Sequence, residues 1–589
     1  MNDEVLMKRR DFLACAAAVP FVGLPKLLMG EDGAVAPVPA LDAARIKPSD
    51  FSDADLDMPF ALSHFARVAN SVVLDGPTRG FIDISVWRGT NQLHPYNARI
   101  MESILTLTWF YTAARSWNPY RGNPAVRARL ELAFDFWCNS QSGDGKFSEY
   151  GPQEWNLAAT SFAVKFISEA LRLLKGGPGI SESIHARAVD ACRKAVHAVL
   201  FDPEFYSHGC SFSNQYTNIF AGGAAFLALY PDTALSARLR ERLEASPKDM
   251  QSPAGYMYEA DGPDLGYTLN THHENLQMAY SYWRGTDLGN LLVEEENRFS
   301  EWLSFNALPE PGTDFFVLNR GIETRQKHAT YPYIDTPLAE RCVMMRAFAT
   351  PPERRAEQIR DAREKLNREW PQVAPLAVGE FSALSPYRFL QRASYEWHPM
   401  AEQIAEARKM LRPVNEQSFV KQLRDTRKPI AFTYVRRPGY YAAFASAPKA
   451  ITEQERLGLT LVWSPTRGVL MQSQTSGSDT AWGTSAGGAS PVEATGLEAE
   501  YSDGGAAVRY PLAGGGEKSV MFGPESIRVA VKREGEIVER VPVFDPKCVV
   551  SSAPTVVTAQ AASPVPGKSF FLVELKGTGR LEYEIRPGG

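Results

Sequence analysis

The spacing of apolar residues changes once along this chain of 589 residues, and that change constrains the fold more than any other feature. Between about residues 55 and 410, apolar residues recur three and four positions apart, as over 157–174, which is the spacing of helices. Beyond about residue 428, short β-branched or aromatic runs such as 430–435 and 457–463 lie between turn residues, as strands do. The sequence therefore predicts a helical half followed by a β half.

Many of the predicted helices are apolar over more than half of their circumference, which is typical of helices that pack against others on two sides. Repeated helix pairs of this kind indicate an α/α toroid, an incomplete barrel of helix pairs. The strands follow one another without an intervening helix, which favours an antiparallel β-sandwich. We expect the toroid to be a catalytic domain over residues 41–411, with a linker over 412–429 and the sandwich over 430–589.

The first residues have the pattern of an export signal. Arg9-Arg10 stands directly before an apolar stretch over 12–28, and Arg-Arg-x-Phe-Leu resembles the twin-arginine signal, which exports folded proteins. Small residues follow, and Ala40 is the expected end of the signal. We therefore expect a signal peptide over residues 1–40 and a periplasmic or secreted mature protein.

Composition excludes several classes of function. The net charge is −5 at pH 7 and no block of Lys or Arg is present, so there is no basic field for nucleic acid. No later stretch reaches the roughly 18 continuous apolar residues of a membrane span. The cysteines lack C-x-x-C spacing and no His-Glu-x-x-His occurs, so no zinc site is indicated. We expect no cofactor, while a structural Ca²⁺ ion and the oligomeric state stay open.

Polar side chains gather in four segments of the helical half. The densest, residues 256–275, packs tyrosines, carboxylates, amides and two adjacent histidines ahead of an apolar helix. Such groups are costly to bury without partners, and they are what a sugar-binding pocket needs. A second segment, 211–218, brings amides to a helix N-terminus, where exposed N–H groups favour a carboxylate. The other two segments hold Arg325 with Tyr331, and Glu154 with Trp155.

Two short motifs resemble those of heparinase-like and alginate lyases. Asn214-Gln215-Tyr216-Thr217 before a helix is similar to their Asn-His-Gly-Thr segment, with Gln215 where His is usual. Asp261-Gly262 followed by His272-His273 is similar to their Asp-Gly…Tyr-His segment, with His272 near the position of the catalytic Tyr. These families pair an α/α toroid with a C-terminal antiparallel β domain. The resemblance therefore implies a polysaccharide lyase whose substrate is an acidic polysaccharide.

Cleavage of a 4-linked uronate by β-elimination requires that its carboxylate be neutralised, so that the proton on C5 becomes acidic. Amide and guanidinium donors suit this task because they hydrogen-bond the developing charge. We assign it to Asn214, assisted by Gln215 and Arg325, although Asn214 is also suited to capping a helix. The remaining substrate-binding candidates are Tyr216, Asn270, Glu154 and Trp155.

The reaction also needs a base for the C5 proton and an acid for the departing O4. A neutral imidazole suits the base, which we assign to His272 or His273, and a phenol suits the acid, Tyr267 or Tyr331. Adjacent side chains on a helix point about 100° apart, so we expect only one of the two histidines to face the substrate. A role for the pair in a structural hydrogen-bond network stays open.

Two other functions also stay open. A glycoside hydrolase on an α/α barrel needs two carboxylates roughly 5–10 Å apart, one of them protonated. A non-catalytic glycan-binding protein needs aromatic and amide groups but neither histidine nor paired acids, so the density of segment 256–275 favours an enzyme. The candidate carboxylates for a hydrolase are Glu259, Asp261, Asp264, Glu149 and Glu154.

Overall fold

The structure is a computed structural model that describes residues 35–86, 88–325, 328–372, 384–392, 394–474, 480–485 and 491–587. Most of the predicted signal lies outside these ranges, so export stays a prediction. Val38, however, is buried and pairs with Asn70 through its backbone N and O, at 2.8 and 2.9 Å, and Ala36 O accepts from Arg129 at 2.6 Å. A signal ending at Ala40 would remove these contacts, and the position of its end stays a prediction.

The chain divides into two compact units. Unit 1 comprises Met1–Tyr206, Asn218–Leu239 and Arg355–Ser394, and unit 2 comprises Ser207–Thr217, Arg240–Arg354 and Tyr395–Gly589. These units do not follow the expected boundary at residue 411. Unit 2 instead joins the C-terminal sheet to the helical segment that contains the densest polar stretch.

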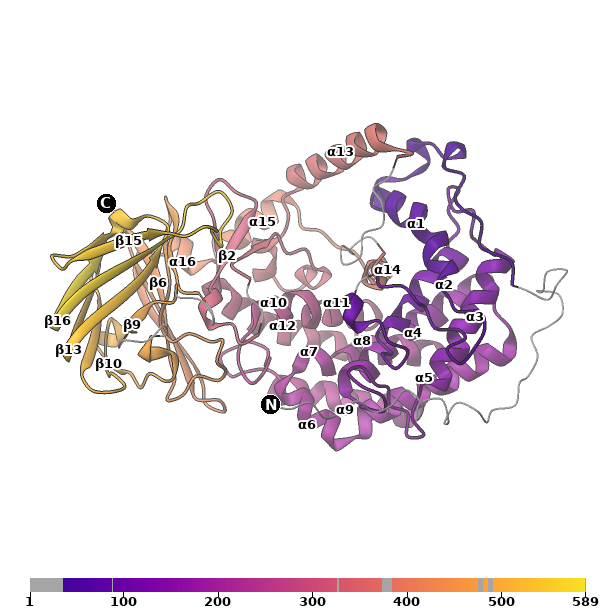
Figure 1. The fold of residues 1–589 in the computed structure, drawn as a ribbon, viewed down its shortest axis with the longest axis horizontal. Coiled ribbons are helices and arrows are strands. Elements are labelled where there is room, and N and C mark those ends of the chain that lie inside the picture. Colours follow the sequence, from indigo (N-terminus) through magenta and orange to yellow (C-terminus); the bar gives the residue numbers. More distant parts are fainter. Residues whose placement is uncertain are drawn as a thin grey trace. The chain divides into compact units, whose positions relative to one another are not determined.

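Unit 1 is helical, as the apolar spacing predicts (Figure 1). Its helices are α1 (Met58–Asn70), α2 (Ile104–Thr112), α3 (Pro124–Asn139), α4 (Leu157–Gly176), α5 (Glu182–Phe201), α8 (Asn218–Leu229) and α14 (Pro386–Gln391). Three helices have residues in both units: α6 (Pro203–Ser211), α9 (Thr233–Asp249) and α13 (Pro352–Glu369).

Helix α4 lies in the core of unit 1. Its N-terminus is capped by Asn156, whose side chain accepts the Ala159 N–H at 2.8 Å. Every residue from Leu157 to Leu171 is buried, because α4 packs against α2, α5 and α8. Helix α8 approaches so closely that a Cβ on Gly222 would lie 2.6 Å from a backbone nitrogen of α4, so only glycine fits. This layered packing of helices is what the all-round apolar character predicts.

Unit 2 holds a second group of helices: α7 (Ser213–Tyr216), α10 (Leu265–Tyr267), the π-helix η7 (Thr268–His272), α11 (His273–Trp283), α12 (Asp287–Asn306), α15 (Ala401–Arg408) and α16 (Arg412–Asn415). It also holds a small antiparallel sheet of β1 (Ala307–Pro309), β2 (Phe315–Leu318) and β3 (Thr330–Pro332). Only helices were expected here. The strand β2 forms because its four residues are aromatic, β-branched or Leu and follow a turn that contains Gly312.

The other strands form one antiparallel sheet, in the order β10-β11-β12-β13-β8-β7-β6-β5-β4, with β16 paired to β13. The antiparallel β domain is thus confirmed, and its strands curl around a buried core (Figure 1). The long strand β13 lies in the middle of this sheet, because it pairs with β12, β16, β8 and β9. The strands are β4 (Phe419–Asp425), β5 (Ile430–Arg437), β6 (Tyr440–Ser446), β7 (Gly458–Ser464), β8 (Gly468–Gln472), β9 (Gly483–Ser485), β10 (Glu500–Ser502), β11 (Ala507–Pro511), β12 (Glu517–Phe522), β13 (Ile527–Val543), β14 (Val549–Val550), β15 (Thr555–Ala559) and β16 (Phe571–Ile585).

The segment expected to be a linker, 412–429, is structured. It contains α16 and the strand β4, which pairs with β5 along its whole length. The sheet therefore begins at Phe419 rather than at residue 430. The strand β4 was not predicted because it lacks an apolar run. It is an edge strand, and its central side chains are mostly polar and half-exposed.

A buried ion cluster lies inside the sheet. Lys518 has no exposed surface, and its Nζ lies 2.8 Å from Glu493 and 2.8 Å from Glu539. The same ammonium lies 3.6 Å from the ring centroid of Trp482. Burial raises the pKa of Glu539, while Lys518 opposes that shift. The two carboxylates are therefore tolerated in the core because one ammonium serves both.

Replacing this ammonium tests the cluster. We expect Lys518→Met to lower the free energy of unfolding by about 3–5 kcal/mol, because two buried carboxylates lose their counter-charge. Urea unfolding of the full chain measures the change. Lys532→Met is the matched control, since Lys532 is exposed on β13, and it should change stability by less than about 0.5 kcal/mol. A loss below about 1 kcal/mol for Lys518→Met would contradict an ionised cluster.

Candidate functional site

The densest polar segment folds in unit 2 into a strained turn followed by a π-helix. Glu259 N donates to Gly262 O at 2.8 Å, and the intervening Ala260 and Asp261 have φ of 51° and 68°. Non-glycine residues rarely adopt this left-handed conformation. The π-helix η7 then connects α10 to α11. Left-handed non-glycine residues and π-helical turns both concentrate at functional sites, so the backbone alone marks this segment.

Two buried carboxylates fasten this segment to the loop that carries Arg325. Asp264 Oδ1 accepts the Tyr267 N–H and its Oδ2 accepts the Arg325 N–H, both at 2.8 Å. From the opposite loop, Glu323 accepts the Gly266 N–H at 3.1 Å and the His328 N–H at 2.9 Å. Burial raises the pKa of Glu323 well above its usual range, and the neighbouring Asp264 adds to the shift. These contacts fix the backbone of Tyr267 beside that of Arg325.

The side chains of Arg325 and Tyr267 consequently stack. The Arg325 guanidinium carbon lies 4.2 Å from the Tyr267 ring centroid, and Nη1 donates to the carboxylate of Glu259. Arg325 keeps 32% of its side chain exposed and Tyr267 is half-buried, whereas Glu259 is 1% exposed. Within the described residues the Tyr267 hydroxyl has no hydrogen-bond partner. The buried Glu259 thus binds the guanidinium of Arg325 from the interior, while the phenol of Tyr267 stays accessible to solvent.

The charge of Glu259 depends on pH in the neutral range. Burial raises its pKa to about 8, while Arg325 and the backbone N–H of Asn214 lower it. Below this value the folded protein favours a neutral Glu259, so the guanidinium of Arg325 keeps more of its positive charge for a ligand. Above it, the carboxylate neutralises Arg325.

Residues 211–217 of the second polar segment lie beside the strained turn. Ser213 N donates to Tyr258 O at 3.0 Å, and Asn275 Nδ2 donates to Asn214 O at 3.3 Å. Asn214 is 4% exposed and does not cap α7, whose N-cap is Phe212. Its backbone N–H instead bonds the carboxylate of Glu259. Asn214 therefore supports the Arg325 partner from the interior.

Gln215 and Tyr216 differ in accessibility. Gln215 is half-buried, with its Oε1 3.1 Å from His208 Nε2, so it keeps surface for a ligand. Tyr216 has no exposed surface and packs on Gly209, where a Cβ would lie 2.6 Å from the tyrosine Cβ. The assignment of Tyr216 to substrate binding is therefore corrected, because a fully covered ring cannot contact a sugar.

Both histidines are buried and lie beside glutamates of α12. His272 has no exposed surface, and its Nδ1 lies 3.1 Å from Ser213 Oγ while its Nε2 lies 3.3 Å from Glu295. His273 is 2% exposed, with Nδ1 3.1 Å from Glu296. A general base must reach its proton directly or through one water. The assignment of the base to His272 or His273 is therefore corrected: these rings join α7, α11 and α12.

The other predicted site residues remain accessible. Tyr331 on β3 donates to Oδ1 of Asn270, which is exposed on η7, at 2.8 Å. Burial raises the pKa of Tyr331 to about 12, and Glu274 adds to the shift, so the phenol keeps its proton near neutral pH and suits hydrogen bonding. Glu154 and Trp155 belong to unit 1, where both are exposed on the loop before α4.

Sequence reasoning missed the contacts that position Arg325. Thr452 Oγ1 donates to Thr324 O at 3.1 Å, and Arg456 N donates to Gly321 O at 2.7 Å, so the loop between β6 and β7 supports the Arg325 loop. A Cβ on Gly262 would lie 2.6 Å from Thr324 Cγ2, which explains the glycine. The pair Asp261-Gly262 predicts a turn. No pattern in the sequence shows that this turn lies near the loop between β6 and β7.

The part of the chain that the structure describes contains free thiols but no arranged group of metal ligands. Among the described residues, no group of three or more His, Cys, Asp or Glu side chains is arranged to hold a metal ion. In the same ranges no helix has the length and apolar character needed to cross a membrane. The need for a cofactor and the binding of Ca²⁺ stay predictions. The cysteines in these ranges are free thiols: Cys138, Cys192, Cys210, Cys342 and Cys548.

Comparison with known proteins gives a match at the level of fold. No protein-family model and no curated protein sequence matches the chain. Heparinase III superposes with a TM-score of 0.51 at 10% identity, covering 94% of this chain and 87% of that chain. The chain has the heparinase-like polysaccharide lyase fold.

Two weaker matches accompany the heparinase-like one. A chondroitin AC lyase of Streptomyces coelicolor A3, in complex with chondroitin sulphate, has a TM-score of 0.47 at 12% identity, covering 94% of this chain and 81% of that chain. A GH127 β-L-arabinofuranosidase of Geobacillus stearothermophilus T6 has a TM-score of 0.24 at 11% identity, covering 90% and 79%. The heparinase-like fold, with its helices followed by an antiparallel sheet, agrees with the architecture predicted from the sequence.

The structural role of His272 can be separated from a catalytic one. We expect His272→Ala to lower the free energy of unfolding by about 2–4 kcal/mol, because the lost ring leaves a cavity and Glu295 keeps only its long contacts to Ser246. Guanidinium unfolding measures this change. His208→Ala, at an exposed histidine of the same unit, should cost less than about 0.5 kcal/mol. Unchanged stability together with lost activity would return the role of base to His272.

Proposed function

We propose that the chain is a polysaccharide lyase that cleaves a uronate-containing acidic polysaccharide by β-elimination. The observation that carries this proposal is the accessible Arg325 guanidinium stacked on the accessible Tyr267 ring, with both held from the interior. The heparinase-like fold supports the proposal. Export by the predicted twin-arginine signal would bring the enzyme to polymers outside the cytoplasm.

In this proposal Arg325 binds the uronate carboxylate. A guanidinium offers parallel N–H donors that match a carboxylate, and its positive charge stabilises the enolate-like charge that develops when C5 loses its proton. Glu259 fixes one end of the guanidinium, so little side-chain freedom is lost when the substrate binds. Gln215, Asn270 and Tyr331 supply further polar groups for the sugar hydroxyls.

Tyr267 transfers the proton. Its phenolate removes the proton from C5, the C5 electrons form the C4–C5 double bond, and the bond from C4 to O4 breaks. The phenol thus formed returns the same proton to O4 of the leaving sugar. One residue performs both steps, and the charge of Arg325, 4.2 Å from the ring, stabilises the negative charge that moves through this region.

A glycoside hydrolase on the same unit is less well supported. Its two carboxylates would have to face the substrate, but Glu259 and Asp264 are each 1% exposed and bonded inward. Asp261 is accessible, but its carboxylate is already paired with Lys428, whose Nζ lies 2.8 Å away. The accessible groups are a cation and a phenol, which suit elimination better than hydrolysis.

Removal of the phenol tests the role of Tyr267. We expect Tyr267→Phe to lower kcat by at least about 10²-fold, as for loss of a general acid–base group, with unchanged thermal stability. The assay follows the ultraviolet absorbance of the unsaturated sugar formed from a panel of uronate polymers. Tyr333→Phe, at a half-buried tyrosine near β3, is the matched control.

The same assay distinguishes the competing functions. A hydrolase releases reducing ends without the unsaturated chromophore, and a binding protein releases neither. If Tyr267→Phe keeps full activity on a polymer that the wild-type protein cleaves, Tyr267 does not transfer the proton.

The pKa of Glu259 predicts how activity depends on pH. Glu259 is neutral below about pH 8 and charged above it, where it repels the uronate carboxylate and neutralises Arg325. We therefore expect KM to rise by about tenfold as pH rises through about 8, because the substrate carboxylate then binds more weakly. In Glu259→Gln this rise should be absent, because the amide stays neutral.

The ionisation of Glu259 should also change the free energy of unfolding with pH. The pKa of Glu259 is raised from 4.5 to about 8 on folding, so the folded state keeps a proton that the unfolded state has lost. The contribution of Glu259 to the free energy of unfolding therefore decreases as pH rises from about 4.5 to about 8. A pH series of urea unfolding should show a smaller decrease for Glu259→Gln, and an equal decrease would contradict the shifted pKa.

A further inference from the structure

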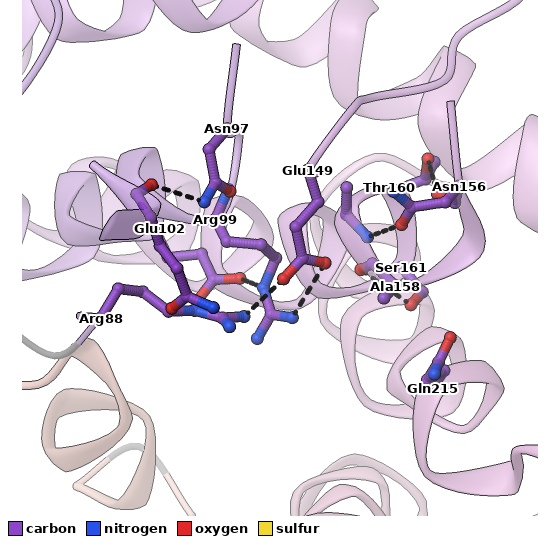
Figure 2. Close-up of polar contacts among 12 residues, drawn as sticks. Arg88, Asn97, Arg99, Glu102, Glu149, Asn156, Ala158, Thr160, Ser161 and Gln215 are labelled. Carbon is purple, nitrogen blue, oxygen red and sulfur yellow. Dashed lines mark hydrogen bonds and ion pairs between the residues drawn. The ribbon is translucent and has the colours of Figure 1, made fainter. Parts of the chain in front are cut away.

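A cluster of charged side chains in unit 1, which the proposed elimination does not use, is balanced within itself (Figure 2). Arg88 Nη2 lies 2.9 Å from Glu149 Oε1, and Arg99 Nη1 lies 3.7 Å from the other oxygen of the same carboxylate. Arg99 also donates to Glu102. The two guanidiniums thus have two carboxylates as partners, and this cluster stabilises unit 1. Hydrogen-bonding groups that are open to a partner lie instead in unit 2, in the backbone at one edge of the sheet.

This edge is the strand β15 (Thr555–Ala559), at the rim of the sheet (Figure 1). Among the described strands, β15 pairs only with β16. Its five residues are all exposed, so that solvent reaches both faces of the strand. Val556 and Val557 keep 47% and 48% of their surface exposed. The strand is therefore held by its pairing with β16 rather than by burial of its side chains.

The backbone groups of β15 point alternately towards β16 and away from it. Pro554 O accepts the Lys576 N–H at 3.0 Å, and Gln560 N donates to Phe570 O at 2.9 Å. The register between these two bonds is continuous, so the even-numbered residues bond to β16. The odd-numbered residues direct their N–H and C=O groups away from β16: Thr555, Val557 and Ala559. The outer edge therefore presents donors and acceptors to a further strand.

The two strands that end the main order of the sheet, β4 and β10, are protected against such pairing, whereas β15 is not. The strand β4 carries Lys421 and Arg424, and β10 has three residues, one of which is Glu500. Charge and shortness are common means by which edge strands avoid association. Around β15, residues 548–567 contain no Asp, Glu, Lys or Arg. Pro554 does not protect the outer edge, because the side of its backbone that lacks an N–H faces β16.

Charge complementarity favours an uncharged partner, and a second copy of the chain supplies one. On β16, the residue opposite Val556 is Glu574, and its carboxylate is already bonded to Arg540 at 3.1 Å. Two β15 edges can therefore approach each other without repulsion between like charges. A strongly charged partner strand would find no counter-charge on β15 itself.

The alternation of the backbone groups also suits a two-fold pair. Antiparallel pairing about an axis at Val557 sets this residue opposite the partner's Val557, and Thr555 opposite the partner's Ala559. These residues have their backbone groups directed outward, so each such pair exchanges both of its hydrogen bonds. Val556 then lies opposite the partner's Thr558, a β-branched pair of the kind that stabilises sheets. The contact is self-complementary, as a two-fold interface requires.

We propose that β15 pairs with β15 of a second copy of this chain, so that the two sheets become continuous and the protein forms a two-fold dimer. Each strand contributes five residues, so the interface is small and we expect a Kd of about 10–100 μM. The inference does not depend on the proposed function, because no residue of β15 belongs to the candidate site.

Sedimentation velocity of the full chain, from about 1 to 200 μM, tests this dimer. We expect the wild-type chain to change from monomer to dimer over this range. Val557→Lys sets two ammonium groups opposite each other and should weaken dimerisation by at least about tenfold. Val557→Pro removes the central outward N–H from each copy and should also weaken it. Proline is tolerated there, because that N–H does not bond to β16.

Matched variants separate this interface from general association. Val343→Lys changes a valine of unit 2 that is 43% exposed and lies outside the sheet, and it should alter the dimer Kd by less than about twofold. Thermal unfolding shows whether each variant keeps the fold. A chain that stays monomeric at about 200 μM, or a Val557→Lys variant that dimerises as the wild type does, overturns the inference.

A cysteine variant tests the register of the two strands. In a hydrogen-bonded antiparallel pair the Cα atoms lie about 5.5 Å apart, which a disulfide can span. Oxidised glutathione should therefore link two copies of Val557→Cys and leave Val343→Cys and the wild-type chain unlinked. If Val557→Cys dimerises without forming this link, the two strands do not meet at Val557 and the proposed pairing is wrong.

Discussion

The site in unit 2 depends on one carboxylate, that of Asp264. Its two oxygens accept the backbone N–H groups of Tyr267 and Arg325, which lie far apart in the chain. Both bonds are at least partly buried, so neither can be exchanged for water at low cost. Because both backbones are bound to the same carboxylate, the phenol and the guanidinium come to lie on one another, and Glu259 needs only to fix the remaining freedom of the guanidinium.

Burial separates the polar groups of this segment into two classes. The side chains of one class are buried inside unit 2: His272, His273, Asn214 and Tyr216. Those of the other class keep exposed surface: Tyr267, Arg325, Gln215 and Asn270. The covered groups join helices, and the exposed groups are those a substrate can contact. The proposed chemistry therefore moves from imidazole to phenol, since only accessible groups can exchange protons with a substrate.

Local patterns were sufficient to predict the helices, most strands and the segments of the site. The spacing of apolar residues and the positions of turn residues identified α4 and the strands from β5 onward. These elements have apolar faces, which produce such a spacing. They did not identify β4, whose edge position allows polar side chains, or β2, whose run of four residues is short. The burial of His272 was also not predictable, because it depends on Glu295 and Ser213, which are distant in sequence. Tertiary contacts of this kind leave no periodic signal.

Residues of the sheet and of the turn that follows β4 contact the segment that forms the site. Asp425 on β4 accepts the hydroxyls of Tyr256 and Tyr258 at 3.0 and 2.5 Å, and Lys428 Nζ lies 2.8 Å from Asp261. These contacts hold the chain on entry to the turn and at its tip. Left-handed Ala260 and Asp261 each cost roughly 1–2 kcal/mol, a cost that the turn alone cannot offset with its single closing pair. The strained turn therefore persists because the sheet fixes it, which explains why this helical segment and the sheet form one compact unit.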